Sequence, residues 1–180
     1  MNEVQPIRDP NQIERMKTEL LKGGYRDYLL FCMGINTGLR VSDLLKLRVQ
    51  DVRGADYYTL KEQKTGKAKR IDLHAVRRQI DEYTEGAAPT DYLFASRKGD
   101  NQPITRVQAY RILQAAAERV GLESIGTHTM RKTFGYHFYK RYGDVVSLQR
   151  LLNHASPAIT LRYIGVTQDE IDALTADFSL

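Results

Sequence analysis

The chain has little cysteine and no cluster of metal-ligating side chains. Cys32 is its one cysteine, and it lies inside the apolar stretch YLLFCMGI. A lone cysteine in such surroundings is typically a small buried side chain, so disulfides and cysteine-rich metal sites are excluded. The four histidines are scattered and lack the spacing of metal ligands. We therefore expect no metal and no other cofactor.

Long apolar runs, export signals and linkers are also absent. No apolar run reaches the length of a membrane span, and the first residues, MNEVQPIRDP, lack a basic and then apolar signal. The tetrapeptide KTGK is no nucleotide-binding loop, because it lacks the Gly-x-x-x-x-Gly-Lys-Ser/Thr pattern. Repeats and Pro/Gly/Ser-rich linkers are missing too, which predicts a single domain over 1–180. The missing membrane span and export signal predict a cytoplasmic protein without membrane partners.

Basic residues exceed acidic ones, giving a net charge of +5. This excess alone is a weak indication of nucleic-acid binding. The stretch KEQKTGKAKR (61–70) concentrates it, with five basic residues and one acid. Such a run is equally typical of a solvated surface hairpin, so the two interpretations stay open at this point.

Periodicity and capping residues predict a mostly α fold with a small antiparallel β-sheet (α+β). DYYTLKEQ and AKRIDL flank a Lys-Thr-Gly-Lys turn and predict a hairpin with a basic tip, and residues 92–94 predict a further short strand. Helices are expected from Asp9-Pro10 to Gly23-Gly24, over 26–36, 41–48, 75–83 and 105–120, and after the caps Thr127, Asp144 and Ser156. Thr167 and Glu170 form a capping box for a terminal helix.

Several polar residues are ordinary when taken singly. Arg40 and a lysine at a hairpin tip are usually solvated, and His154 near a helix end can simply interact with the helix dipole. His128 and Arg131, one turn apart on one helix face, are a common surface pair. Tyr163 is one of 11 tyrosines, and most tyrosines are packing residues.

Taken together, these residue types can cleave a phosphodiester without metal. Two arginines can bind the non-bridging oxygens and stabilise the charge that develops at phosphorus. A histidine can accept the nucleophile's proton, and a lysine can protonate the leaving oxygen. A tyrosine can attack, although with a pKa of about 10 only roughly one phenol in a thousand is ionised at pH 7. Neighbouring cations are expected to favour the phenolate.

The order TGLR, KTGK, His-x-x-Arg, and then a histidine with Tyr163 nine residues on, resembles the catalytic domain of the tyrosine recombinase (phage integrase) family over about residues 9–165. The resemblance implies that fold and a covalent 3′-phosphotyrosyl on Tyr163. It also implies that Arg40 and Arg131 bind the scissile phosphate, that Lys64 is the general acid and that His128 assists proton transfer. His154 would hydrogen-bond the phosphate or its surroundings.

The sequence departs from the family pattern at two positions. Asn153 stands where glycine usually precedes the second histidine, and asparagine tolerates the left-handed helix cap expected there. Met130 replaces a common leucine, a nearly volume-conserving change. Lys64 directly precedes the Thr-Gly turn, with Lys61, Lys67 and Lys69 as near competitors for the same role.

The resemblance implies double-stranded DNA as partner and a homo-oligomer, a tetramer, on DNA, with a monomer or weak association without it. Members usually carry an N-terminal DNA-clamping domain, which we expect to be absent because the catalytic part begins almost at Met1. The tail 167–180 either packs on its own domain or is exchanged between protomers. Candidate DNA contacts are Lys61, Lys67, Lys69, Arg70, Arg106, Gln108, Arg111, Gln114 and Lys132.

Two other functions compete with DNA recombination or integration. A type IB topoisomerase would use similar chemistry to relax DNA without exchanging strands. A non-catalytic DNA-binding regulator on the same scaffold would have no need of Tyr163. The complete set of arginine, histidine and tyrosine residues favours the recombinase.

Overall fold

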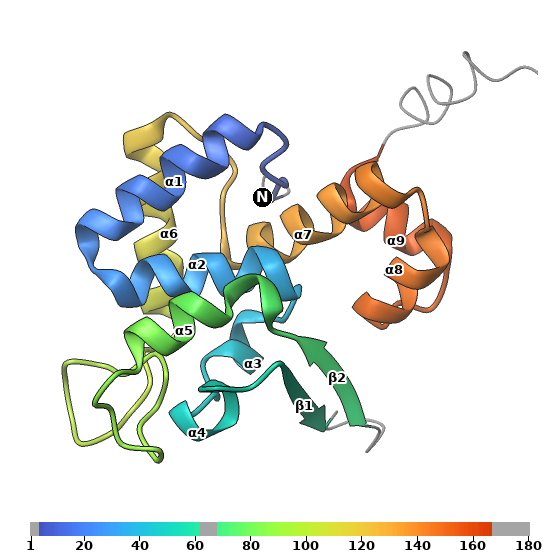
Figure 1. Cartoon of the computed structure of the whole chain (residues 1–180). Helices are drawn as coiled ribbons and strands as arrows, with labels where there is room; N and C mark the ends of the chain where they lie inside the picture. Colours follow the sequence, from blue (N-terminus) through green and yellow to red (C-terminus); the bar gives the residue numbers. More distant parts are fainter. Residues whose placement is uncertain (1–3, 62–67, 167–180) are drawn as a thin grey trace, which may run out of the picture.

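The computed structural model describes residues 4–61 and 68–166, and its elements follow one another in the order helices, hairpin, helices (Figure 1). The elements are α1 (Pro10–Gly23), α2 (Tyr25–Thr37), α3 (Val41–Leu44), α4 (Val49–Val52), β1 (Tyr57–Lys61), β2 (Ala68–Asp72), the 3₁₀ turn η1 (His74–Val76), α5 (Arg77–Tyr83), α6 (Arg106–Val120), α7 (Thr127–Tyr142), α8 (Val145–Leu152) and α9 (Pro157–Ile164). The predicted α+β class is confirmed, and none of the described helices is long and apolar enough to cross a membrane.

Polar side chains cap four of the described helices, as predicted. Asp9 Oδ1 accepts from Asn11 N at 2.8 Å, with Pro10 as the first helical residue. Thr105, Asp144 and Ser156 cap α6, α8 and α9 in the same way. One cap differs from the prediction: α7 has Gly126 before it and Thr127 as its first helical residue. The Gly126 N–H donates to Thr129 Oγ1 at 3.0 Å, so the backbone there is satisfied without Thr127.

Two predicted elements are wrong in extent or type. Residues 41–48 do not form one helix, because the chain forms two four-residue helices, α3 and α4, with a turn between them. Residues 92–94 form no strand and make only an isolated bridge between Arg48 and Tyr92. Leu93 and Phe94 are buried, and their backbone pairs with Leu47 and Ile104 on different loops. Apolar character there reflects burial, which periodicity cannot tell apart from a strand.

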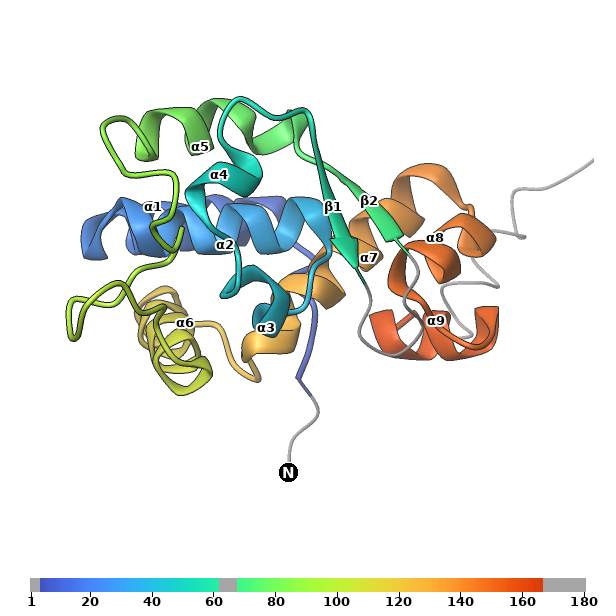
Figure 2. The same cartoon turned by 90° about the horizontal axis from the view of Figure 1, so that it is seen from below.

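The molecule has two hydrophobic cores joined by α7 (Figures 1 and 2). The larger lobe contains α1, α2, α5 and α6, and the antiparallel hairpin β1–β2 lies beside it, with Tyr57 opposite Asp72. The smaller lobe consists of α8, α9 and the C-terminal part of α7, around Tyr136, Leu148, Leu152 and Ile164. Helix α7 therefore belongs to both lobes.

Two glycines allow the helices around α7 to approach closely. A Cβ added to Gly34 of α2 would lie 2.7 Å from Met130 Cβ, and one added to Gly135 of α7 would lie 2.6 Å from Ile164 Cγ2. Real Cβ atoms essentially never come so near another atom, so both contacts depend on glycine. They bring the end of α2 and the helix α9 against the same helix.

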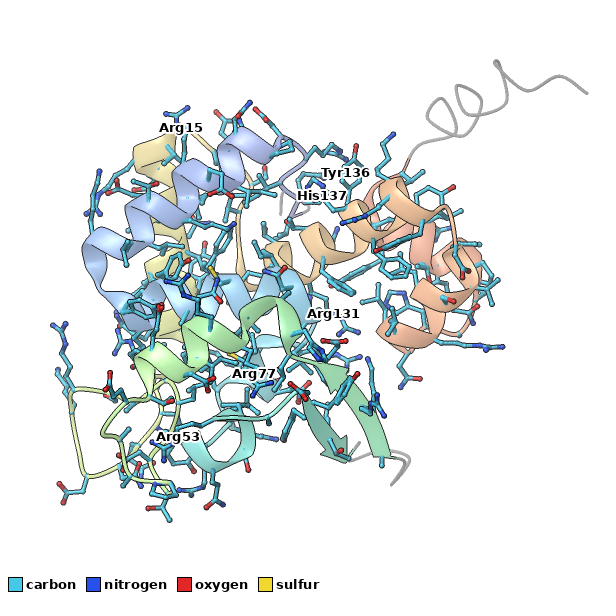
Figure 3. The ribbon with its side chains drawn as sticks, viewed as in Figure 1. Arg15, Arg53, Arg77, Arg131, Tyr136 and His137 are labelled. Atoms are coloured by element: carbon cyan, nitrogen blue, oxygen red, sulfur yellow. The ribbon has the colours of Figure 1, made fainter. Side chains whose placement is uncertain are left out.

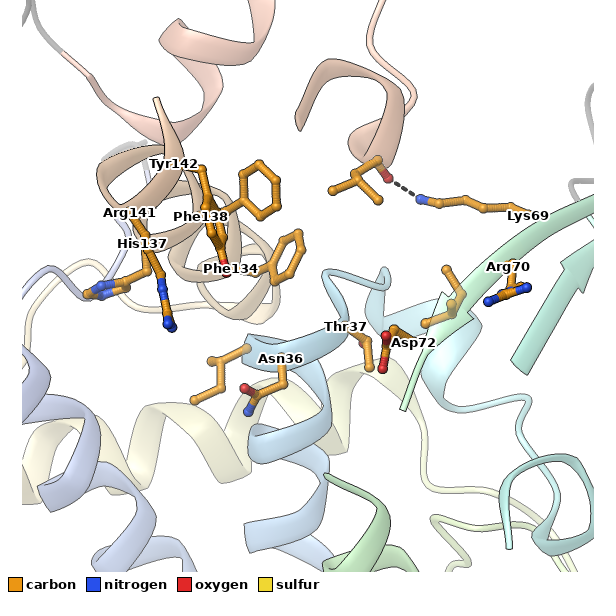
Figure 4. A pocket seen from close by; sticks show the side chains of 13 residues that line it. Asn36, Thr37, Lys69, Arg70, Asp72, Phe134, His137, Phe138, Arg141 and Tyr142 are labelled. Atoms are coloured by element: carbon orange, nitrogen blue, oxygen red, sulfur yellow. Dashed lines mark hydrogen bonds between the residues drawn. The ribbon is translucent and has the colours of Figure 1, made fainter. Parts of the chain in front are cut away.

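A cavity of about 420 Å³ lies between the lobes (Figure 4). The aromatic rings of Phe134, Phe138 and Tyr142 line it from α7, and Lys69 and Arg70 reach it from β2. Lys69 Nζ donates to the carbonyl of Leu151 near the end of α8, so the hairpin contacts the smaller lobe across this cavity.

Candidate active site

Arg40 is placed by the end of α2. The helix ends at Gly38, which has the left-handed backbone (φ 63°) that glycine adopts without strain. Two residues later, Arg40 precedes the first turn of α3, and its carbonyl accepts the Asp43 and Leu44 N–H groups. Its guanidinium-bearing side chain is exposed and lines a cavity beside the first turn of α7.

Arg131 lies on α7 at the junction of the lobes (Figure 3). His128 precedes it by three residues, so the two side chains are on the same face of the helix. Only 5% of its surface is exposed. It donates to the Gly38 carbonyl at the end of α2 and to the Leu152 carbonyl at the end of α8, the latter at 2.6 Å. Burial, then Arg40, lowers the pKa of Arg131, while Tyr163 and Asp43 act the other way. An arginine stays charged in proteins, so a buried cation is fixed between the ends of α2 and α8.

His154 follows the left-handed residue Asn153, as expected. Asn153 has φ 51° and ends α8, so the asparagine does keep the cap geometry. His154 Nδ1 lies 3.1 Å from Thr160 Oγ1 on α9, and the Gln149 amide donates to the His154 carbonyl at 3.1 Å. Burial and then Arg131 and Arg40 lower the pKa of His154.

Tyr163, in the last turn of α9, points into the group of cationic residues. Its hydroxyl lies 3.4 Å from His128 Nδ1, and its ring meets the His154 ring edge to face at 4.9 Å between centroids. Lys132 Nζ lies 5.3 Å from the ring centroid. As expected, the neighbouring cations favour the phenolate, but burial, which the sequence did not indicate, outweighs them. Burial raises the pKa of Tyr163 above 10, and Arg131 and Arg40 offset that only in part.

The site contains a cationic cavity of about 190 Å³. It is lined by Arg40, Val41, Ser42, Arg106, Thr127, His128 and Arg131. No carboxylate is in this lining, so the cavity suits an anion such as a phosphate group. Burial, followed by Arg131 and Arg106, lowers the pKa of His128 below 6.5, so the imidazole is neutral at pH 7 and able to accept a proton.

The other candidate DNA contacts lie in different places. Lys64, Lys67 and the side chain of Lys61 are outside the described residues. Lys69 and Arg70 line the cavity between the lobes, and the Arg70 guanidinium stacks 3.6 Å above the Tyr57 ring. Arg111 and Gln108 are exposed on α6, and Gln114 donates to the Ile125 carbonyl. Of the members of this group that the structure describes, Arg106 is the one that lines the cationic cavity.

Three residues that contribute to the site were not singled out as such in the sequence. Lys132, which the sequence predicts only as a DNA contact, is 5% exposed and lies against Tyr163. Thr160 contacts His154, and Asp43 acts on Arg131 through its charge. The spacing of Asp43, three residues after Arg40, is a signal that could have found it; the other two become visible only once α7 and α9 are packed together.

Comparison with known proteins gives one consistent answer. The model of the phage integrase family matches residues 8–170. The probable integrase/recombinase YoeC of Bacillus subtilis is 51% identical over 170 residues, which cover 94% of this chain and 93% of YoeC. Tyrosine recombinase XerC of Pelobacter propionicus is 33% identical over 160 residues, 86% of this chain and 52% of that protein.

Solved structures agree on the fold. The crystal structure of XerA recombinase aligns with a TM-score of 0.77 at 19% identity, covering 98% of this chain and 64% of that one. XerH bound to the palindromic difH substrate in a post-cleavage complex aligns with a TM-score of 0.73 at 21% identity, covering 98% and 54%. The chain thus spans nearly all of YoeC but only about half of XerC and XerH.

Proposed function

Because this chain belongs to the phage integrase family, we propose that it is a tyrosine recombinase that breaks and rejoins DNA strands through Tyr163. The observation that carries this proposal is the position of the Tyr163 hydroxyl, 3.4 Å from His128 and beside a cavity lined by Arg40 and Arg131. A tyrosine that served only packing would not need a neutral histidine and two arginines around its hydroxyl.

The reaction is a transesterification in which no bond energy is lost to hydrolysis. The Tyr163 oxygen attacks the scissile phosphorus, a 3′-phosphotyrosyl bond forms, and the bond to the 5′ oxygen breaks. His128 accepts the phenol's proton, and Lys64 donates a proton to the 5′ oxygen. The reverse attack by a 5′ hydroxyl of another strand releases Tyr163 and joins the DNA.

Arg40, Arg131 and His154 would act on the phosphate. The guanidinium groups can donate to its non-bridging oxygens, where negative charge grows in the transition state. Arg131 is already fixed by two helix-end carbonyls, so its position costs little reorganisation when the phosphate arrives. Among the described residues, no group of His, Cys, Asp or Glu could hold a metal ion, and metal-free chemistry stays a prediction.

The test is covalent trapping on DNA that carries a nick next to the cleavage site, using a library of candidate sites. Cleavage releases the short fragment between the cleavage site and the nick, which carries the 5′ hydroxyl. Without this hydroxyl the strand cannot be rejoined, so an SDS-resistant adduct accumulates. We expect Tyr163→Phe to abolish the adduct while DNA binding persists. Tyr142→Phe is the matched control, because that tyrosine is 61% exposed on α7. A wild-type chain that forms no adduct on any site would contradict the proposal.

Trapping excludes a non-catalytic regulator, and assays of plasmid relaxation and strand joining separate the other alternative. A type IB topoisomerase would relax plasmids regardless of sequence and would not join strands from two duplexes. A non-catalytic regulator would bind DNA without any adduct. Nothing in the site favours either of them over a recombinase.

We further propose double-stranded DNA as the partner and a tetramer on DNA. Support for DNA as the partner comes from structural relatives: XerH is bound to its difH substrate, and the Tn1549 transposon integrase is bound to a circular intermediate DNA. The tail 167–180 lies outside the described residues, but its apolar Ile171, Leu174 and Phe178 recur at helical spacing, which suits exchange between protomers. Deleting 167–180 should abolish self-association on DNA and leave the remaining domain folded; unchanged assembly would contradict the exchange.

A further inference from the structure

The helix that carries the nucleophile is short. Helix α9 has eight residues, and its buried Thr160 and Ile164 pack toward α8 and α7. Tyr163 lies in its last turn, two residues before Gly165, which ends the helix. A small shift of this turn would therefore carry the phenol away from His128.

The last turn of α9 is contacted by a segment from the other end of the chain, residues 5–8. Arg8 Nη2 donates to the Gly165 carbonyl at 3.0 Å, the residue that ends α9. A cation at this point also suits the negative end of the helix dipole. The Arg8 guanidinium lies 5.4 Å from the centroid of the Tyr136 ring, so it stands between α7 and the end of α9.

The backbone of this segment is itself fixed to α7 (Figure 3). The Ile7 N–H donates to Thr133 Oγ1 at 2.9 Å, and His137 Nε2 lies 2.9 Å from the Ile7 carbonyl. The Ile7 side chain is 1% exposed, and Gln5 N donates to the Ser124 carbonyl at 3.0 Å just before α7. Arg8 thus extends from a backbone that is held against the helix carrying His128 and Arg131.

Gly165 is suited to this contact in two respects. Its φ of 73° is in the left-handed region that favours glycine. A Cβ there would lie 2.9 Å from Arg8 Nη2, which is closer than real Cβ contacts come. Any other residue would push the guanidinium away from the carbonyl.

We propose that Arg8 is a positioning residue for the nucleophile. Residues 5–8 fix the end of α9 relative to α7, and so hold the Tyr163 hydroxyl against His128. Arg8 touches neither the phosphate nor the phenol in this proposal. The inference rests on the proposed function, because it concerns how fast Tyr163 reacts.

The experiment measures single-turnover adduct formation by the full chain with Arg8→Ala, Arg8→Lys and, as matched control, Arg15→Ala, which removes an exposed arginine of α1. At saturating DNA we expect Arg8→Ala to slow adduct formation roughly tenfold to a hundredfold, the scale of a displacement of about 1 Å. DNA affinity should change no more than in the Arg15 control. Arg8→Lys should restore much of the rate, because an ammonium can still donate to the Gly165 carbonyl.

A second readout separates positioning from acid catalysis. DNA with sulfur in place of the 5′ bridging oxygen has a leaving group that needs no protonation. It should not restore the rate of Arg8→Ala, because the defect lies in the attack. Should Arg8→Ala fail to fold, Arg8→Gln is measured by the same criteria, since its shorter amide cannot span the gap that the guanidinium spans.

The proposal is overturned if the Arg8 variants react at the control rate, if their loss equals their loss of DNA affinity, or if it follows a fall in the unfolding temperature that Arg8→Lys shares. These outcomes differ from a failure of the proposed function, in which the wild-type chain and the Arg15 control would form no adduct either.

Discussion

The Tyr163 hydroxyl lies among cations and still keeps its proton at neutral pH. Burial raises the pKa of Tyr163, and the charges of Arg131 and Arg40 offset this only in part. A neutral phenol is a weak nucleophile, so its proton has to leave during the attack. His128, 3.4 Å away and itself neutral because burial and cations lower its pKa, is the group in reach that can take it.

This pairing predicts how the rate depends on pH. The proton acceptor is neutral His128, and its pKa lies below 6.5. The second-order rate constant for adduct formation should therefore increase with pH only up to about pH 6.5 and stay level from pH 7 to pH 9. In His128→Ala the phenolate has to form first. Its pKa exceeds 10, so the rate should increase about tenfold for each pH unit across the same range.

The size of the defect is a second part of this expectation. At pH 7 we expect His128→Ala to react about a hundredfold more slowly, which is at the low end of general-base effects. His74→Ala is the control, because His74 is exposed and pairs with Asp72 far along the sequence from the site. A level profile in His128→Ala would show that another group takes the proton.

Arg106 is the third arginine of the cationic cavity. It begins α6, is exposed, and acts on His128 through its charge. Arg111, on the same helix, is exposed as well and does not line the cavity. Arg106 can therefore be tested for a contact with a phosphate, with Arg111 as a control on the same helix.

We expect Arg106→Ala to weaken DNA binding by a similar factor on all sequences. The slope of log K against log salt concentration should become less steep by about 0.9, the value of one phosphate contact. Adduct formation at saturating DNA should also slow. Arg111→Ala should leave that rate unchanged. If the loss in Arg106→Ala is confined to one base pair of the target, Arg106 reads a base and the phosphate contact is refuted.

At the scale of elements, the hairpin carries the competing proton donors. Lys64 is the favoured general acid because it directly precedes the Thr-Gly turn, and Lys69 is a near competitor in the same run of basic residues. In the structure Lys69, on β2, donates to the Leu151 carbonyl of α8 and lines the cavity between the lobes (Figure 4). Lys64 lies outside the described residues, so its role as the general acid stays a prediction.

The choice between these lysines can be tested with the leaving group. Lys64→Ala should slow cleavage of ordinary DNA about a hundredfold, as expected for loss of a general acid. DNA with a 5′ bridging sulfur should restore the rate, because a thiolate departs without a proton. Lys69→Ala should show no such selective recovery, since its effect reaches the site through α8. Recovery in Lys69→Ala and not in Lys64→Ala would reverse the assignment.

Local signals explain which elements were predictable. Asp9, Thr105, Asp144 and Ser156 cap helices through hydrogen bonds within three residues, so their sequence context is sufficient. Residues 41–48 and 92–94 were misassigned because their apolar side chains are buried by distant segments. The Leu93 N–H donates to the Leu47 carbonyl and the Ile104 N–H donates to the Phe94 carbonyl, and such partners on other loops leave no local pattern.

At the scale of the whole molecule, the site lies at the junction between two cores. Arg40 comes from the larger lobe, Arg131 from the shared helix α7, and His154 and Tyr163 from the smaller lobe. The order of motifs predicted which residues meet. It could not predict the burial of Lys132 and Tyr163, or the raised pKa that follows, because these depend on how α9 packs against α7.

The unequal size of the cores predicts unequal local stability. Among the described residues, the smaller core has Tyr136, Leu148, Leu152 and Ile164 as buried members, whereas the larger core extends over the helices from α1 to α7 and the hairpin. Opening of α8 and α9 exposes little apolar surface and so should need less free energy than global unfolding. Hydrogen exchange in low denaturant should show α8 and α9 amides exchanging through this partial opening, and α2 amides only through global unfolding.

DNA should reduce this difference in stability between the lobes. A phosphate can bind between Arg40 and the smaller lobe only while α8 and α9 are packed in place. At a DNA concentration of 100 times Kd the opening should cost about 2.7 kcal/mol more. Tyr163→Phe is the variant to use, since it binds without reacting. Arg131→Ala should lose most of the added protection, because Arg131 connects the ends of α2 and α8. Exchange of the α8 and α9 amides only by global unfolding would contradict this expectation. Equal protection of both lobes by DNA in Arg131→Ala would show that the phosphate does not join the lobes.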